Sequence, residues 1–213
     1  MNVGIALIAT MTALILGLVT ASAKGTFDTV NQDVRRISAE LLSLDRLLAR
    51  YGPEAIPVRE ALRDAVKARI EGIWPPAGSP VAAIDPARSA AAVEKLVATI
   101  RSLSPQTDEQ RWLQGRAEDI AESLLTSRWV ALGDTRGSVP PVLLVIVICW
   151  LSITFASFGL FAPSNGTVLT ILFLCSMSVA AAVFLILELD DPLTGLVRIS
   201  PEPLYYAVAH MAR

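Results

Sequence analysis

The sequence contains few of the residue types that enzyme active sites use. It has one histidine, His210, close to the C-terminal end. Its two cysteines, Cys149 and Cys175, lie inside apolar segments, where a cysteine is typically a small buried hydrophobic residue rather than half of a disulfide. We find no Cys-x-x-Cys, His-Glu-x-x-His, Gly-x-Ser-x-Gly or phosphate-loop motif. These absences argue against an enzyme, and we expect no catalytic residues.

Charge is also missing, from two long parts of the chain. Residues 1–23 and 137–187 contain no Asp, Glu, Lys, Arg or His. Between Lys24 and Arg136 the sequence has 16 basic and 16 acidic residues, and the net charge of the whole chain is −2. No basic surplus exists for binding phosphates, so we expect no nucleic-acid partner. The uneven distribution of charge indicates that the chain meets both water and lipid.

Three uncharged segments have the length of membrane-spanning helices. They are residues 3–23, 142–162 and 167–187, and about 20 apolar residues in a helix cross the hydrocarbon core. A short turn, Pro163-Ser164-Asn165-Gly166, joins the second and third segments into a hairpin. The prediction is an all-α integral membrane protein with a first transmembrane helix (1–24), a helical bundle (25–140), a transmembrane hairpin (141–190) and a C-terminal tail (191–213).

Basic residues next to the spans predict the orientation of the chain. They follow the first span, precede the second and follow the third, whereas the hairpin turn has none: Lys24, Arg35, Arg36, Arg128, Arg136 and Arg198. Because basic residues favour the cytoplasmic side, we expect a multi-pass protein of the cell membrane, with the bundle and the tail cytoplasmic and Met1 outside. Ala21-Ser22-Ala23 offers an alternative interpretation as a signal-peptide cleavage site. No basic residue precedes the apolar run, however, and the run is longer than a typical signal core.

A heptad stripe begins where the first span ends. Its apolar residues alternate at spacings of three and four: Phe27, Val30, Val34, Ile37, Leu41, Leu44, Leu48 and Tyr51. This spacing predicts one long helix that leaves the membrane and ends before Gly52-Pro53. The stripe can pack within the chain, which we favour, or pair with another chain as a coiled coil. Charged residues of this helix, such as Asp45-Arg46 and Arg35-Arg36, are expected on its solvated side.

Three further amphipathic helices complete the predicted bundle. The first extends to Ile73 and is followed by a proline-rich linker from Trp74 to Pro86. The second ends before Ser104-Pro105. Thr107 and Gln110 form the pattern of a capping box that starts the third. The apolar residues of this last helix are Leu113, Ala117, Ile120, Leu124 and Ala131.

Two segments have compositions that suggest a role in ion binding or ion passage. Glu188, Asp190 and Asp191 follow the third span directly, and they either mark the exit from the membrane or attract or bind cations at a pore mouth. The first span is rich in small residues such as Gly4, Ala13 and Gly17, which allow helices to approach closely, as around a narrow pore.

Several blocks of the sequence resemble the bestrophin-like family of bacterial membrane proteins. They are residues 7–10 (LIAT), 21–24 (ASAK), 44–54 (LDRLLARYGPE), 158–165 (FGLFAPSN) and 187–192 (LELDDP). The resemblance covers nearly the whole chain. It is more distant to bestrophins themselves, which are pentameric ion channels with four spans. Another span usually precedes the one matched by residues 3–23 in this family, and the sequence does not contain it.

The resemblance implies a homo-oligomer with a central pore, and a pentamer if the chain follows bestrophins. The first span would line the pore neck with Thr10, Leu14 and Leu18, the last directly after Gly17. Glu188, Asp190 and Asp191 lie where animal bestrophins have part of a calcium site, so the resemblance suggests calcium as a ligand. The expected function is a passive ion channel, with lipid and inorganic ions as partners and the bacterial inner membrane as its location. The alternative is a non-conducting membrane scaffold or sensor whose bundle binds a partner.

Overall fold

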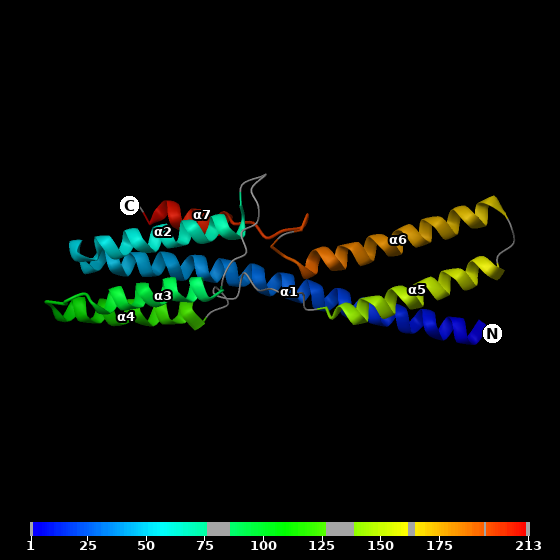
Figure 1. Cartoon of the computed structure of the whole chain (residues 1–213), viewed down its shortest axis with the longest axis horizontal. Helices are drawn as coiled ribbons and strands as arrows, with labels where there is room; N and C mark the ends of the chain where they lie inside the picture. The colour runs from blue at the N-terminus through cyan, green and yellow to red at the C-terminus, as the bar shows by residue number, and fades with distance from the viewer. Residues whose placement is uncertain (1, 76–85, 127–138, 162–164, 194, 212–213) are drawn as a thin grey trace. The chain divides into compact units, whose positions relative to one another are not determined.

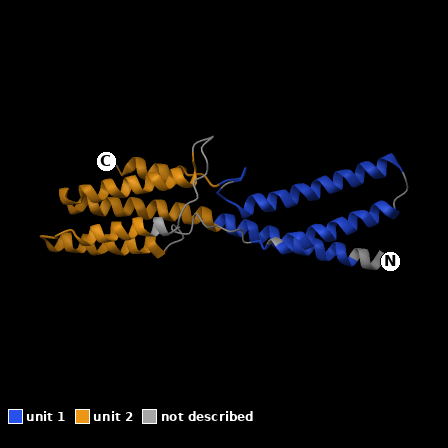
Figure 2. Cartoon of the chain, viewed as in Figure 1, with its two compact units in different colours: residues 1–28, 136–198 blue, residues 29–135, 199–213 orange. Residues whose placement is uncertain are grey.

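The computed structural model describes residues 2–75, 86–126, 139–161, 165–193 and 195–211, and all regular secondary structure in these ranges is helical. The helices are α1 (Asn2–Tyr51), the 3-10 turn η1 (Pro53–Ala55), α2 (Ile56–Ile73), α3 (Pro86–Arg101), α4 (Asp108–Thr126), α5 (Pro141–Phe161), α6 (Gly166–Asp190) and α7 (Glu202–His210) (Figure 1). They form two compact units, residues 1–28 with 136–198 and residues 29–135 with 199–213 (Figure 2). The long helix α1 contributes to both units.

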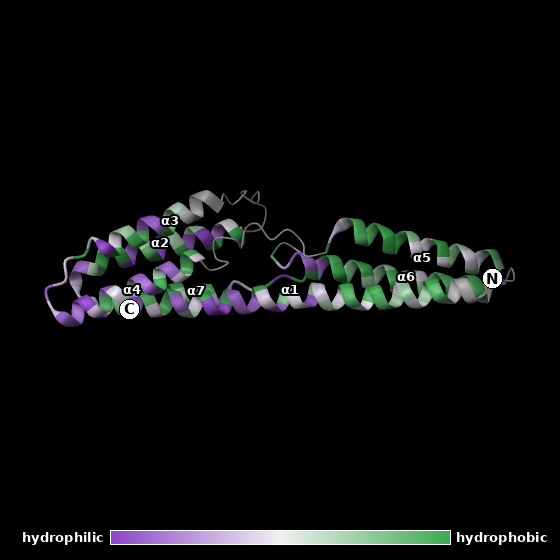
Figure 3. Ribbon diagram, turned by 90° about the horizontal axis from the view of Figure 1, so that it is seen from below, coloured by the Kyte–Doolittle hydropathy of each residue, from purple (hydrophilic) through white to green (hydrophobic). Residues whose placement is uncertain are grey.

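The first unit contains three helices that are long and apolar enough to cross a membrane. They are α1, α5 and α6, and Figure 3 shows α5 and α6 mostly in the green of hydrophobic residues. This confirms the three predicted spans, although α6 extends beyond the predicted end to Asp190. Helices α5 and α6 contact each other, as the hairpin prediction requires, while residues 162–164 of its turn lie outside the described ranges.

A small apolar core ties the three helices of this unit together. Val19 and Ala23 of α1 are buried with Ile186 and Leu189 near the end of α6. Half-buried residues from α1, from the start of α5 and from the segment just before it surround them: Ile15, Leu16, Phe27, Val139 and Leu143. The core therefore lies at the ends of the spans where α6 finishes and α5 begins.

The heptad stripe of α1 forms the core of the second unit. All of its residues from Val30 to Tyr51 are buried within the single chain, and Phe27 is half-buried in the first unit. Hydrogen bonds join this part of α1 to α2 through Asp45 and to α4 through Tyr51. The preferred prediction, that the stripe packs within the chain, is confirmed.

Gly52 ends α1 as the sequence predicts. Its φ of 129° lies in a region that side chains with a Cβ rarely adopt, so only glycine fits without strain. The chain then makes one 3-10 turn from Pro53 to Ala55 before α2 begins at Ile56. The turn reverses the chain direction and lets α2 pack back along the unit.

The predicted capping box at the start of α4 is half formed. The Gln110 N–H donates to Thr107 Oγ1 at 3.1 Å, as expected. The Gln110 side chain, however, accepts from the N–H of Gln106 at 2.8 Å instead of that of Thr107. Its Nε2 donates to the Tyr51 carbonyl at 3.0 Å, so the cap also fastens α4 to the end of α1. Ala131, placed on this helix by the sequence, lies outside the described residues.

Helix α7 was not predicted, and it corrects the expectation that residues 191–213 form a tail. Its buried residues Leu204, Ala207 and Val208 form one face, and it contacts α2. The Trp74 indole N–H donates to the Ile199 carbonyl at 3.0 Å just before α7. A nine-residue helix contains too few turns for its periodicity to stand out from a loop.

Candidate functional site

Helix α1 has two different faces within the first unit. Thr12, Val19 and Ala23 are buried, the last two in the core shared with α6, whereas Leu14 and Leu18 are 77% and 70% exposed. Successive residues turn by about 100° around a helix, which places Leu14 opposite Ala23. Leu7, Thr10, Met11, Leu14, Gly17, Leu18 and Ala21 therefore share one exposed face, which we call the open face of α1.

All four residues of the predicted neck lie on the open face. Leu14 and Leu18 are one helical turn apart, and Thr10 is one turn before Leu14. The Thr10 hydroxyl donates to the Leu7 carbonyl at 2.9 Å, so its proton is already bonded within the helix. At Gly17 an added Cβ would have no neighbour within 4 Å. The open face thus combines two large apolar side chains with a flat position at which another helix can approach closely.

The three acids at the end of α6, Glu188 and Asp190 in its last turn and Asp191 directly after it, do not converge on one point. Glu188 Oε2 accepts hydrogen bonds from the N–H groups of Leu196 and Val197, the latter at 3.3 Å. Asp190 accepts from the Val139 N–H, with distances of 3.2 and 3.4 Å to its two carboxylate oxygens. Asp191 is exposed. The acids at 188 and 190 therefore bind backbone groups of two different segments.

No group of three or more histidine, cysteine or acidic side chains in the described part of the chain has the geometry of a metal site. Glu188, Asp190 and Asp191 are among the residues described. Calcium favours six to eight oxygen ligands, and two of these carboxylates already hold backbone N–H groups. Calcium binding at this position stays a prediction from the resemblance.

Asp45 was predicted to lie on the solvated side of its helix, and this prediction is wrong. Its side chain is 3% exposed and accepts two hydrogen bonds from Arg59 of α2, from Nε at 2.8 Å and from Nη2 at 2.9 Å. The bond to Asp45 raises the pKa of the Arg59 guanidinium above its ordinary value. Arg59 Nη2 also donates to the Met211 carbonyl at the end of α7. Arg35, Arg36 and Arg46 are exposed, as predicted.

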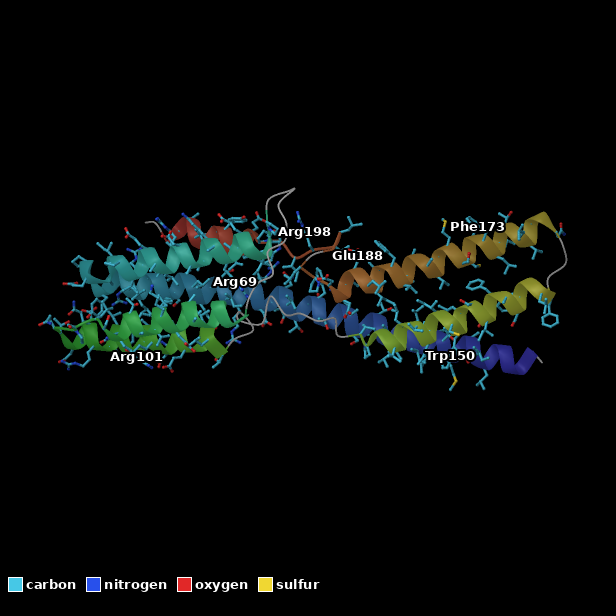
Figure 4. The ribbon with its side chains drawn as sticks, viewed as in Figure 1. Arg69, Arg101, Trp150, Phe173, Glu188 and Arg198 are labelled. Atoms are coloured by element: carbon cyan, nitrogen blue, oxygen red, sulfur yellow. The ribbon has the colours of Figure 1, made fainter. Side chains whose placement is uncertain are left out.

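The outer surfaces of α5 and α6 are apolar and exposed. Cys149 and Cys175 are free and lie on these surfaces, which corrects their predicted burial. Residues of both helices line a shallow hollow of about 550 Å³: Phe155, Leu169, Thr170, Leu172, Phe173 and Ser176. The exposed Phe173 of α6 and the half-buried Trp150 of α5 are labelled in Figure 4. An apolar surface of this kind suits hydrocarbon rather than water.

Comparison with known proteins identifies the family. The sequence matches the Bestrophin-like domain over residues 2–204. The chain belongs to the Bestrophin-like family. No curated protein matches it significantly.

Solved structures have the same fold as this Bestrophin-like chain. Three single-substitution variants of a bacterial Bestrophin homolog from Klebsiella pneumoniae are similar to it, with TM-scores of 0.74, 0.64 and 0.60. They are 14%, 15% and 16% identical, and each match covers at least 98% of this chain and at least 85% of the other. At these identities the likeness shows the fold alone. Membership of the Bestrophin-like family and the three apolar helices together indicate a membrane protein.

Proposed function

We propose that this chain is a passive ion channel, assembled from several copies whose α1 helices surround a central pore. The open face of α1 carries the proposal. This face is apolar and lies opposite the residues that pack against α5 and α6, so it is available to line an axis. Membership of the Bestrophin-like family supports it, because bestrophins are ion channels.

In this assembly Leu14 and Leu18 form the narrow neck. Rings of leucine one turn apart make a constriction that excludes water when narrow and conducts when it widens. Thr10 lies one turn farther from the bundle and adds a ring of hydroxyl oxygens, which can still accept hydrogen bonds. Gly17 leaves room beside Leu18 for the neighbouring α1 to approach.

The assembly we propose is a closed homo-oligomer, with five copies as in bestrophins. Each copy crosses the membrane more than once, and the second unit lies in the cytoplasm, on the side that the basic residues near the spans favour. Glu188, Asp190 and Asp191 then lie at the cytoplasmic exit of α6. Their negative charge raises the local concentration of cations there. We propose the inner membrane of a bacterium as the location.

Ion flux into liposomes tests the channel directly. Purified protein reconstituted into liposomes is expected to pass small inorganic ions at a rate well above that of empty liposomes. Replacing both Leu14 and Leu18 by alanine should increase the flux, because smaller side chains widen the neck and let water enter. Leu169→Ala is the matched control, since Leu169 is 72% exposed on α6 and has no place in the proposed neck.

Two results would contradict the proposal. One is flux no higher than in empty liposomes for every common ion tested. The other is an equal change of flux in the Leu14/Leu18 variant and in the Leu169 control. A monomer or dimer by mass measurement in detergent would favour the alternative function, a membrane scaffold or sensor whose cytoplasmic bundle binds a partner.

A further inference from the structure

The segment after α6 directs apolar side chains first inward and then outward. Pro192 and Leu193 are buried, whereas Leu196 is 83% exposed and Val197 is 41% exposed. Arg198, also exposed, follows them directly. Residues 196–198, which we call the exit loop, therefore present two aliphatic side chains and one cation on the surface of the first unit.

The Glu188 side chain fixes the backbone of the exit loop. Its Oε2 accepts the N–H groups of both Leu196 and Val197. A Cβ at Gly195 would overlap this same carboxylate oxygen, so the arrangement depends on glycine there. Hydrogen bonds to an ionised carboxylate are about twice as strong as neutral ones. These hydrogen bonds thus hold the backbone conformation in which Leu196 and Val197 are exposed. Glu188 and Arg198 are labelled in Figure 4.

The position of the exit loop next to the end of α6 indicates whether water or lipid surrounds it. The helix is uncharged from Gly166 to Leu187, so this stretch is suited to hydrocarbon, and Glu188 would then mark the level at which the chain reaches water. Hydrogen bonds to Glu188 hold the exit loop at that level. Aliphatic side chains next to an arginine are typical of segments that rest in the interface of a membrane, with the guanidinium at the lipid phosphates.

We propose that the exit loop is a lipid-contacting element: Leu196 and Val197 enter the interfacial layer of the bilayer, and Arg198 binds lipid phosphate. Glu188 is its positioning residue, because it holds the loop in the conformation that turns these side chains outward. The assignment depends on membrane insertion of α6 and is independent of ion conduction. The result would be a second attachment of each copy to the membrane surface, directly beside the end of α6.

Fluorescence quenching measures the depth of the exit loop. The full chain, with Cys149→Ala and Cys175→Ala to remove native thiols, receives Leu196→Cys and a bimane label and is reconstituted in phosphatidylcholine–phosphatidylglycerol liposomes. A lipid with a nitroxide near its headgroup is expected to quench this label several-fold more than the same label at Lys67, an exposed position on α2. Aqueous iodide should quench it several-fold less than at Lys67.

Variants of Glu188 test the positioning role. Glu188→Ala should reduce quenching by the lipid nitroxide several-fold, because both loop hydrogen bonds are lost. Glu188→Gln, which keeps an acceptor oxygen, should retain most of it. Glu202→Ala, at an exposed glutamate of α7, is the matched control and should change nothing. Retained helicity by circular dichroism and an unchanged elution volume would show that the variants are folded.

Two outcomes overturn the proposal. If iodide quenches the label at Leu196 as strongly as at Lys67, the loop lies in water. If neither quencher reaches it, another copy of the chain covers the loop. Arg198→Gln adds a separate arm, since loss of the guanidinium should lower quenching by nitroxide-labelled phosphatidylglycerol more than by the labelled phosphatidylcholine. Equal effects on the two lipids would remove Arg198 from the assignment.

Discussion

The buried ion pair between Asp45 and Arg59 allows the sharpest prediction for the helical bundle. The Asp45 side chain is 3% exposed and that of Arg59 is 21% exposed, and two parallel hydrogen bonds join them. Asp45→Ala removes the anion and leaves a guanidinium partly buried beside the apolar stripe of α1. Breaking a buried pair in this way costs about 3–5 kcal/mol. Arg59 keeps some contact with water and its bond to Met211, so we expect the lower end, about 3 kcal/mol.

Urea unfolding in mild detergent, followed by circular dichroism, measures this loss. A cost of about 3 kcal/mol raises the ratio of unfolded to folded protein by a factor on the order of 100. Asp119→Ala is the matched control, because Asp119 is exposed and pairs with Arg116 at 3.5 Å on the surface of α4. Surface pairs contribute about 0.2–1 kcal/mol, so this variant should unfold almost as the wild type does.

A double replacement separates charge from packing. When Asp45 and Arg59 are both changed to leucine, no charge is left uncompensated, and most of the stability should return. The reasoning is refuted if Asp45→Ala costs no more than Asp119→Ala. It is also refuted if the double variant is less stable than Asp45→Ala alone.

Two further predictions concern polar groups buried in the same unit. The Tyr51 hydroxyl is buried and has no hydrogen-bond partner among the described residues, so Tyr51→Phe should stabilise the bundle by about 1 kcal/mol near neutral pH. Burial, followed by the charge of Glu54, raises the pKa of Tyr51 above 10. The stability of the wild type should therefore fall as pH rises through and beyond 10, where the unfolded tyrosine loses its proton, and this fall should be smaller in the variant. Parallel curves of stability against pH, from urea titrations of the two proteins, would contradict this. Trp74→Phe leaves the Ile199 carbonyl without its donor and should cost about 1–3 kcal/mol and speed amide hydrogen exchange in α7. Trp112→Phe, at an exposed position, is its control, and equal exchange in both variants would show that the Trp74 bond does not hold this segment.

The spans and the long helix could be predicted because their signals extend over many residues. About 20 uncharged residues have few structural alternatives in lipid, and the stripe from Val30 to Tyr51 repeats often enough to define one helix face. Gly52 and Thr107 could also be predicted from the sequence, because each acts directly on the backbone. Gly52 ends α1 with a positive φ, and the Thr107 hydroxyl accepts an N–H group at the start of α4.

The features that were missed depend on contacts between distant residues. Nothing in the neighbourhood of Asp45 indicates that its partner is Arg59, which returns to it only after the chain turns at Gly52. Cys149 and Cys175 were expected to be buried, but apolar residues in a span face lipid as readily as protein, so hydrophobicity does not indicate burial there. The hydrogen bonds between Glu188 and the exit loop also form only when the chain turns back after the end of α6.

Chemical cross-linking at Leu14 tests most directly whether copies of α1 face one another around an axis. With Cys149→Ala and Cys175→Ala as background, Leu14→Cys protein in liposomes is treated with a short bifunctional thiol reagent. The proposed assembly predicts a ladder of linked species that ends at the number of subunits in the ring, five. It also predicts mainly monomer for Leu169→Cys, a position of similar exposure on α6. Monomer alone at Leu14, or the same ladder at both positions, would contradict a pore lined by the open face of α1.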